Sequence, residues 1–340
     1  MRDVAAKAGV DPSTVSLALR NSPRLPEKTR LQIQKIAAEL GYKANPYVSA
    51  LMQHRSRGRN PDAAPTLAYL TSHPTRAVWK SVPYLKRFYL GCEAEASRLG
   101  WKLEEFWTGD VEWKAERLGK IMAYRSINAV LVAPVGCGEP LQEFPWMHFH
   151  SVAIGSSLKG FGLHYVRPNY FINAQICVQA CLERGYRRIG FAVSAAHNHR
   201  LAQRHLGGCL VFQQLDLSLK ILLPPHFDEN DSLDQLIPWI RKENVEVILT
   251  IYGQDQAVDS LRAAGLRVPE DVAVVSLAVS PDESMSGVDE KLEVIGNKSV
   301  QMLVGMLPNG QPGEQTDPTE VLVKGNWKDG STLPKKKPSH

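Results

Sequence analysis

The sequence predicts a small helical head followed by a large α/β body made of two subdomains. Three observations support this fold class. The first 44 residues contain three short amphipathic segments, broken at Gly9 and again before Pro26. From Thr66 onward, short apolar runs alternate with amphipathic stretches, as in parallel sheets covered by helices on both faces. At 340 residues, the chain is also longer than single hydrophobic cores usually grow.

The head is predicted to contain a helix-turn-helix. Its first two segments each place apolar residues on one helical face: Val4, Ala5 and Ala8, then Val15, Ala18 and Leu19. Gly9 and Val10 separate them as a turn, and Pro12 and Ser13 begin the second helix. In this motif the second helix enters the DNA major groove. The positions of that helix that we expect to read bases are Pro12, Ser13 and Leu17.

A third helix is expected after Pro26, which suits a first helical turn. Its apolar stripe runs through Ile33, Ile36, Ala37 and Leu40, and Gly41 ends it. The following residues begin as a helix-compatible segment and then become rich in Arg, Gly, Asn and Pro, which is typical of a linker.

Six apolar runs of the body are predicted to be strands: residues 66–70, 129–134, 151–155, 188–193, 245–251 and 272–279. A helix is expected near residues 84–99. Their alternation fits two βαβ blocks, one before and one after about residue 160.

The charge distribution points to a polyanion-binding head. Residues 1–60 hold eleven Lys and Arg against four acids, a net charge of +7, whereas the whole chain carries +5 and the remainder therefore −2. Affinity for nucleic acid comes largely from neutralising phosphates. The alternative is that the charge serves only the solubility of the head. No apolar run is long enough to cross a bilayer and Met1 is followed by Arg2, so we expect a cytoplasmic protein.

Catalytic and metal-binding patterns are missing from the sequence. The five cysteines form no CxxC pair, and there is no GxSxG, HExxH or P-loop motif. The HNHR tract at 197–200 would align its two histidines only on a strand or loop. We therefore expect no enzymatic activity, no cofactor and no metal, and the rival functions are a free solute-binding module and a body with retained enzyme activity.

Several motifs resemble one family over nearly the whole chain. The head segments DVAAKAGVDPSTVSLALRN (3–21), KTR (28–30) and ELGYKANPYVSALM (39–52) closely resemble the DNA-binding head of the lactose-repressor/galactose-repressor (LacI/GalR) family. The resemblance continues in the body through GYRRIGF (185–191), GLRVPEDVAVVS (265–276) and VLVKGNWKDGSTL (321–333).

The resemblance implies a dimeric transcription regulator, most often a repressor, that binds a palindromic double-stranded operator. Its body would be periplasmic-binding-protein-like, with two Rossmann-like subdomains and a small-molecule effector of carbohydrate type in the cleft. The implied domains are a helix-turn-helix head at 1–44, a hinge helix and linker at 45–63, and an effector-binding and dimerisation domain at 64–335 that divides near 160.

Specific roles follow by position from the same resemblance. Pro12, Ser13 and Leu17 match base-reading sites, Leu51 matches a leucine that wedges into the minor groove, and Arg204 matches an effector-binding arginine. The positions that match contacts to the DNA backbone are Ser16, Asn21, Thr29 and Tyr42. The alternatives are that Leu17 packs within the head, that the segment around Leu51 is a passive tether, and that Arg204 is an ordinary surface arginine.

The body departs from the family pattern at two places. TIYGQDQ follows the VILT strand, where family members carry Asn-Asp, and LAVSPDE stands where they carry an acidic pair. Arg204 is therefore the one effector contact that the resemblance assigns.

Overall fold

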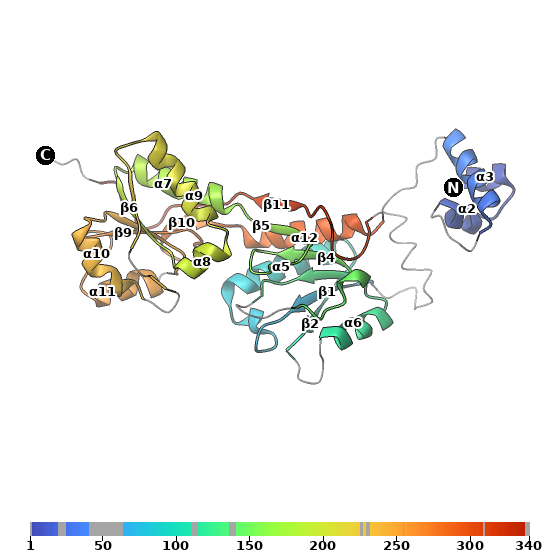
Figure 1. Cartoon of the computed structure of the whole chain (residues 1–340), viewed down its shortest axis with the longest axis horizontal. Helices are drawn as coiled ribbons and strands as arrows, with labels where there is room; N and C mark the ends of the chain where they lie inside the picture. Colours follow the sequence, from blue (N-terminus) through green and yellow to red (C-terminus); the bar gives the residue numbers. More distant parts are fainter. Residues whose placement is uncertain are drawn as a thin grey trace. The chain divides into compact units, whose positions relative to one another are not determined.

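The computed structural model describes residues 2–19, 25–40, 64–109, 115–135, 141–224, 227–228, 232–253, 255–308 and 310–336. The chain forms two compact units (Figure 1), a head within residues 1–63 and a body that holds residues 64–306 and 310–340. None of the helices in the described ranges has the length and apolar character that crossing a membrane requires.

The head consists of three helices, α1 (Arg2–Ala8), α2 (Pro12–Leu19) and α3 (Glu27–Glu39). They close over a small buried cluster: Val4, Ala5, Val15, Ala18, Ile33 and Ala37. The turn between α1 and α2 uses Gly9, whose φ of +65° lies in the left-handed region that a glycine adopts without steric cost. The side chain of Gln34 on α3 donates to the carbonyl of Ala18 at 2.8 Å, which ties the end of α2 to α3.

The first subdomain of the body is built on a six-stranded sheet in the order β11-β5-β4-β3-β1-β2, with every neighbouring pair parallel. Its strands are β1 (Thr66–Thr71), β2 (Lys102–Trp107), β3 (Ala129–Val132), β4 (His150–Ile154), β5 (His164–Pro168) and β11 (Glu320–Val323). Its helices are α5 (Pro83–Arg98), α6 (Ala115–Tyr124) and α12 (Leu292–Met306), with short 3-10 turns η1 (Val78–Lys80) and η2 (Trp146–His148).

The second subdomain repeats this plan in the order β12-β10-β9-β8-β6-β7, with only the β10–β12 pair antiparallel. Its strands are β6 (Arg188–Ala192), β7 (Lys220–Leu222), β8 (Val247–Thr250), β9 (Ala273–Ser276), β10 (Ser286–Asp289) and β12 (Asn326–Lys328). The helical elements are α7 (Tyr170–Glu183), α8 (Ala195–Arg200), α9 (Arg204–Leu215), η3 (Leu233–Leu236), α10 (Ile237–Lys242), η4 (Asp255–Asp259) and α11 (Ser260–Ala263).

This architecture confirms the fold class that the sequence predicted. Each of the six predicted strand segments overlaps an observed strand, and the helix expected near 84–99 is α5. The order of strands in each sheet reverses between β1 and β3 and between β6 and β8, as in doubly wound folds.

The chain crosses between the two sheets three times, after β5, after β10 and after β11. The expected division near residue 160 lies just before the first crossing. The crossings are bonded to one another, because the amide of Asn169 donates to the carbonyl of Val323 at 2.8 Å and the amide of Gly325 donates to Asn173 Oδ1 at 2.9 Å. Consequently α12 and β11, from the last 50 residues, complete the first subdomain.

Helices α5 and α12 pack backbone against backbone in the first subdomain. A Cβ added to Gly296 would collide with the carbonyl of Phe88 and lie 2.8 Å from the amide nitrogen of Cys92, and one added to Gly91 would collide with Glu293. Only glycines therefore permit this close approach of the two helices. The same approach places Cys92 Sγ 3.5 Å from the carbonyl oxygen of Gly296.

Replacing Gly296 by Ala should lower the free energy of unfolding of the body by about 1 to 3 kcal/mol, because the added methyl group overpacks the helix contact. Urea titration of the full chain measures this loss. Gly305→Ala on the same helix is the matched control, since a Cβ there meets nothing within 4 Å. Equal stability of the two variants would show that the helices separate without cost.

Candidate functional site

The outer face of α2 is the candidate DNA surface of the head. Pro12 is exposed at its start, and Leu17 is half-buried but stands outside the hydrophobic cluster of the head. Thr29 is half-buried on α3. Ser13 and Ser16 lie on α2, where the structure describes their backbone but not their side chains, and Asn21, Tyr42 and Leu51 lie outside the described residues.

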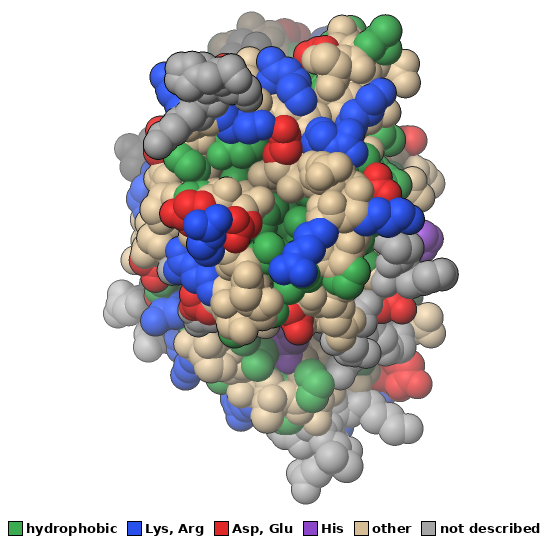
Figure 2. Space-filling view, turned by 90° about the vertical axis from the view of Figure 1, so that its left-hand side faces the viewer, with side chains coloured by type: hydrophobic (Ala, Val, Ile, Leu, Met, Phe, Trp, Pro, Cys, Tyr) green, Lys and Arg blue, Asp and Glu red, His purple; other side chains and the backbone are tan. Residues whose placement is uncertain are grey.

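The body does not share the basic character of the head. Figure 2 shows the end of the second subdomain that faces left in Figure 1, and on it Lys and Arg are interspersed with Asp and Glu. Several cations of this subdomain are paired, such as Arg267 with Asp271 and Lys336 with Glu246, each at 2.6 Å. This mixed surface lacks the single sign of charge that attracts a polyanion.

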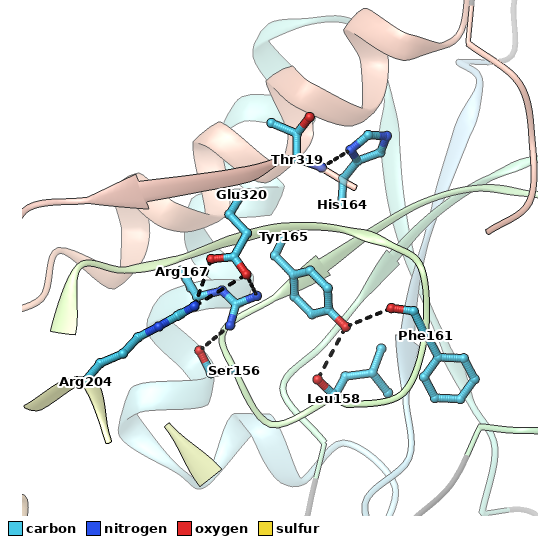
Figure 3. A network of polar contacts seen from close by, with 9 residues as sticks. All are labelled: Ser156, Leu158, Phe161, His164, Tyr165, Arg167, Arg204, Thr319 and Glu320. Carbon is cyan, nitrogen blue, oxygen red and sulfur yellow. Dashed lines mark hydrogen bonds and ion pairs between the residues drawn. The ribbon is translucent and has the colours of Figure 1, made fainter. Parts of the chain in front are cut away.

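Arg204, the arginine singled out in the sequence, begins α9 and reaches across to the first subdomain. Its Nη2 donates to Glu320 Oε2 at 3.1 Å, and Glu320 is the first residue of β11 (Figure 3). The Arg204 and Glu320 side chains are 31% and 38% exposed, so both remain accessible to a ligand. The structure thus brings Arg204 to the junction of the two subdomains.

Arg167 on β5 binds the same carboxylate as Arg204. Its Nη2 donates to Glu320 Oε1 at 2.8 Å, its Nη1 donates to Ser156 Oγ at 3.2 Å, and its guanidinium lies 4.3 Å from the ring centre of Tyr165. Burial lowers the pKa of Arg167, and the nearby Arg204 cation lowers it further, while Glu320 opposes both effects. Glu320 is therefore shared by two guanidinium groups (Figure 3).

Next to Arg204, His205 is buried and packs edge-on against Tyr170, with ring centres 5.0 Å apart. Neither ring nitrogen has a hydrogen-bond partner among the described residues. Burial, with a small contribution from His197, lowers the pKa of His205 to about 3. Burial also raises the pKa of the Tyr170 hydroxyl. Both groups are neutral at physiological pH beside the charged network.

Ligands of doubly wound folds bind outside the carboxyl ends of strands where the strand order reverses. In the first sheet, this position follows β1, where Ser72 and His73 are buried. Ser72 Oγ and His73 Nε2 have no partner within the described part of the chain. In the second sheet, the position follows β6, where Ser194 Oγ accepts from the amide of His197 at 3.2 Å and begins α8.

Four residues of the candidate site were not predicted from the sequence: Arg167, Glu320, Ser72 and His73. Ser72 and His73 carry a usable signal, because two polar residues directly follow the apolar run TLAYL and Thr71. Arg167 and Glu320 carry none, since they are 153 residues apart and meet only because β11 pairs with β5.

Comparison with known proteins agrees with this geometry. Residues 1–45 match the family described as bacterial regulatory proteins, lacI family, and residues 254–332 match the periplasmic binding protein-like domain. Over 94% of each chain, the protein is 24% identical to the HTH-type transcriptional regulator CelR of Thermobifida fusca. It is 22% identical to the ribose operon repressor of Bacillus subtilis (strain 168), over 93% of this chain and 94% of that protein.

Solved structures share the fold. The transcriptional regulator CelR in complex with cellobiose aligns with a TM-score of 0.57 at 22% identity, covering 96% of this chain and 97% of that chain. The lac repressor dimer bound to operator and the anti-inducer ONPF aligns with a TM-score of 0.56 at 16% identity, over 98% of each chain. A helix-turn-helix head on a doubly wound, periplasmic-binding-protein-like body defines a DNA-binding transcriptional regulator. The head thus carries the helix-turn-helix domain of the lacI family of bacterial regulatory proteins, as its sequence resemblance predicted, and the body carries a periplasmic binding protein-like domain.

The depressed pKa of His205 predicts a stability that depends on pH. In the folded protein its imidazole stays neutral down to about pH 3, whereas in the unfolded chain it gains a proton below about 6.5. The unfolded state then binds more protons, so the free energy of unfolding falls as the pH drops through 6.5, by up to about 1.4 kcal/mol per pH unit. Urea titrations at pH 7 and pH 5 should show a loss that is about 1 to 2 kcal/mol smaller in His205→Gln. The exposed His148→Gln is the control and should retain the full loss.

Proposed function

We propose that this regulator represses transcription by binding a palindromic operator as a homodimer, and that a carbohydrate effector bound between its subdomains controls operator affinity. The single observation that carries the proposal is that one chain combines a helix-turn-helix head, whose α2 begins with the exposed Pro12, with a polar junction at Arg204 in the body. The head positions the DNA contacts, and the junction gives a ligand access to both subdomains.

The DNA half of the proposal rests on the head. In helix-turn-helix proteins, residues near the start of the second helix contact base edges, which corresponds to Pro12, Ser13 and Leu17. An apolar side chain such as Leu17 favours a thymine methyl group and makes no hydrogen bond. The proposed contacts to the DNA backbone are Ser16, Asn21, Thr29 and Tyr42, and the proposed minor-groove wedge is Leu51. One head of this size offers few base contacts, so a two-fold dimer on an inverted repeat is the expected arrangement.

The effector half rests on the junction. Arg204 is half-exposed at the boundary, and the buried Ser72 and His73 lie where doubly wound folds bind ligands. Two solved structures of the same fold are named for bound sugars, the CelR complex with cellobiose and a LacI family transcriptional regulator from Enterococcus faecium with ribose. A solute-binding module without DNA binding would leave the head and its family match without a role.

The full-length protein should select an inverted repeat from a pool of random duplexes. The logarithm of its binding constant should fall with the logarithm of salt concentration, with a slope of about −5 to −9 if six to ten phosphates are neutralised.

Leu17→Ala should relax the sequence preference at one symmetric pair of positions, as read by fluorescence anisotropy on operator variants. Leu31→Ala, an exposed leucine on α3, serves as the control. Selection of single half-sites alone would refute the dimeric arrangement.

Arg204→Ala should weaken effector binding about 10- to 100-fold, because it removes hydrogen bonds from a charged donor. Titration calorimetry with a panel of neutral and acidic sugars, beginning with cellobiose and ribose, measures this loss. Operator affinity without sugar should stay within about twofold of the wild type. If both affinities fall together, Arg204 supports the fold rather than the ligand.

A further inference from the structure

Two cations compete for one anion at the junction of the subdomains. Glu320 Oε1 lies 2.8 Å from an Nη2 of Arg167 and 3.5 Å from Nη2 of Arg204, and Glu320 Oε2 lies 3.1 Å from that same nitrogen of Arg204 (Figure 3). One carboxylate therefore balances two guanidinium groups. Arg204 and Glu320 are both partly exposed, and such a pair adds little to stability, so fold stability alone gives a weak reason for the second arginine.

Further positive groups stand on the segments that flank this pair. Lys159 follows β4 on the same loop as Ser156, and its Nζ donates to the carbonyl of His199 on α8 at 3.2 Å. Arg200 ends α8, four residues before Arg204, and its Nη2 lies 2.8 Å from His197 Nδ1. Lys159 and Arg204 thus reach across the boundary from opposite subdomains, and Arg200 stands on the helix that Lys159 contacts.

The arginine pair also has unused hydrogen-bonding capacity. Arg167 is more than nine-tenths buried, and its Nε has no partner among the described residues. A buried donor without a partner carries a desolvation cost that an added acceptor would remove. Planar guanidinium groups accept carboxylate or phosphate oxygens in a bidentate manner.

We propose that the effector carries an anionic oxygen group, a carboxylate or a phosphate on a carbohydrate, which binds Arg204 and Arg167 in place of Glu320. This inference rests on the proposed carbohydrate effector and names its chemical class. A neutral hydroxyl competes poorly with a carboxylate for charged donors, because hydrogen bonds to charged partners are about twice as strong. An anionic group instead offers the two guanidinium groups the same negative charge that the Glu320 carboxylate provides.

The exchange has a structural consequence. Glu320 begins β11, and its bond to Arg204 joins the first subdomain to α9 of the second. At its other end, the carbonyl of Val323 on β11 accepts from Asn169 at the chain crossing. An anion that takes over Arg204 releases the start of β11 and becomes the bridge between the subdomains. Ligand charge is thereby coupled to the relative position of the two subdomains.

The test compares ligands that differ only in charge. Hexoses, hexuronates and hexose 6-phosphates of gluco and galacto configuration are titrated calorimetrically at constant ionic strength, and release of the selected operator is followed by anisotropy. We expect an acidic sugar to bind at least about tenfold more tightly than the neutral sugar of the same configuration and to change operator affinity. The uronate and phosphate arms distinguish the two anionic groups.

Variants separate the site from the fold. Glu320→Gln removes the internal competitor and should raise the affinity for the acidic sugar about tenfold, a larger gain than for the neutral sugar. Glu314→Gln is the matched control, because that carboxylate accepts from the amide of Gly162 at 3.0 Å. Arg204→Gln, at a half-exposed position, should weaken acidic-sugar binding at least tenfold without requiring a change in the buried Arg167.

The outcomes distinguish this inference from the function on which it rests. Preferential binding of a neutral sugar that changes operator affinity would overturn the anionic class and leave the proposed function standing. An acidic-sugar affinity that Glu320→Gln does not change would also overturn the exchange. If no carbohydrate of either kind alters binding to the selected operator, the carbohydrate effector itself is wrong.

Discussion

The backbone contact between α5 and α12 is the constraint on which the rest of the body depends. Gly91 and Gly296 allow the helices to meet without side chains between them, and Gln301 on α12 donates to Glu95 on α5 at 2.7 Å. Arg87 on α5 binds Glu293 at the start of α12 at 2.6 Å. A segment near the end of the chain is thus fixed into the first subdomain. The second subdomain lies between these two helices in the sequence. The chain must therefore cross from the first subdomain to the second and back again.

Polar groups join the three crossings. Asn173 accepts from Gly325, and a Cβ at residue 325 would lie 2.7 Å from the carbonyl of Asp289, so glycine is required where the segments meet. Glu290 is buried at the second crossing, and burial, followed by the charge of Asp289, raises its pKa to about 8. It is therefore largely protonated at neutral pH. A neutral carboxyl can share this confined space with an amide without the desolvation cost of a buried charge.

The head and the body differ in how their charges are distributed. The head is a small cluster of short apolar residues with an excess of positive charge, which suits a module that gains affinity from phosphates. In the body, charged groups pair with groups of opposite sign. At the junction of the subdomains, two arginines share the single carboxylate of Glu320. In the proposed function, sensing relies on specific local pairs at the junction, while DNA binding relies on the summed field of the head.

The sequence by itself determined the local elements. Apolar spacing and Gly9 predicted the head, and uninterrupted apolar runs predicted β1, β3, β4, β6, β8 and β9, because these strands are buried on both faces and read as hydrophobic throughout. The sequence did not predict β2, β5, β7, β10, β11 and β12, and four of these (β2, β7, β11 and β12) lie at sheet edges, where a strand is only partly buried. The family resemblance assigned Arg204, but only the tertiary structure decided its partners. Arg204 and Glu320 are 116 residues apart, and local periodicity carries no information about which distant strand will pair with β5. That choice depends on the path of the chain through its crossings, which brings one carboxylate between two arginines.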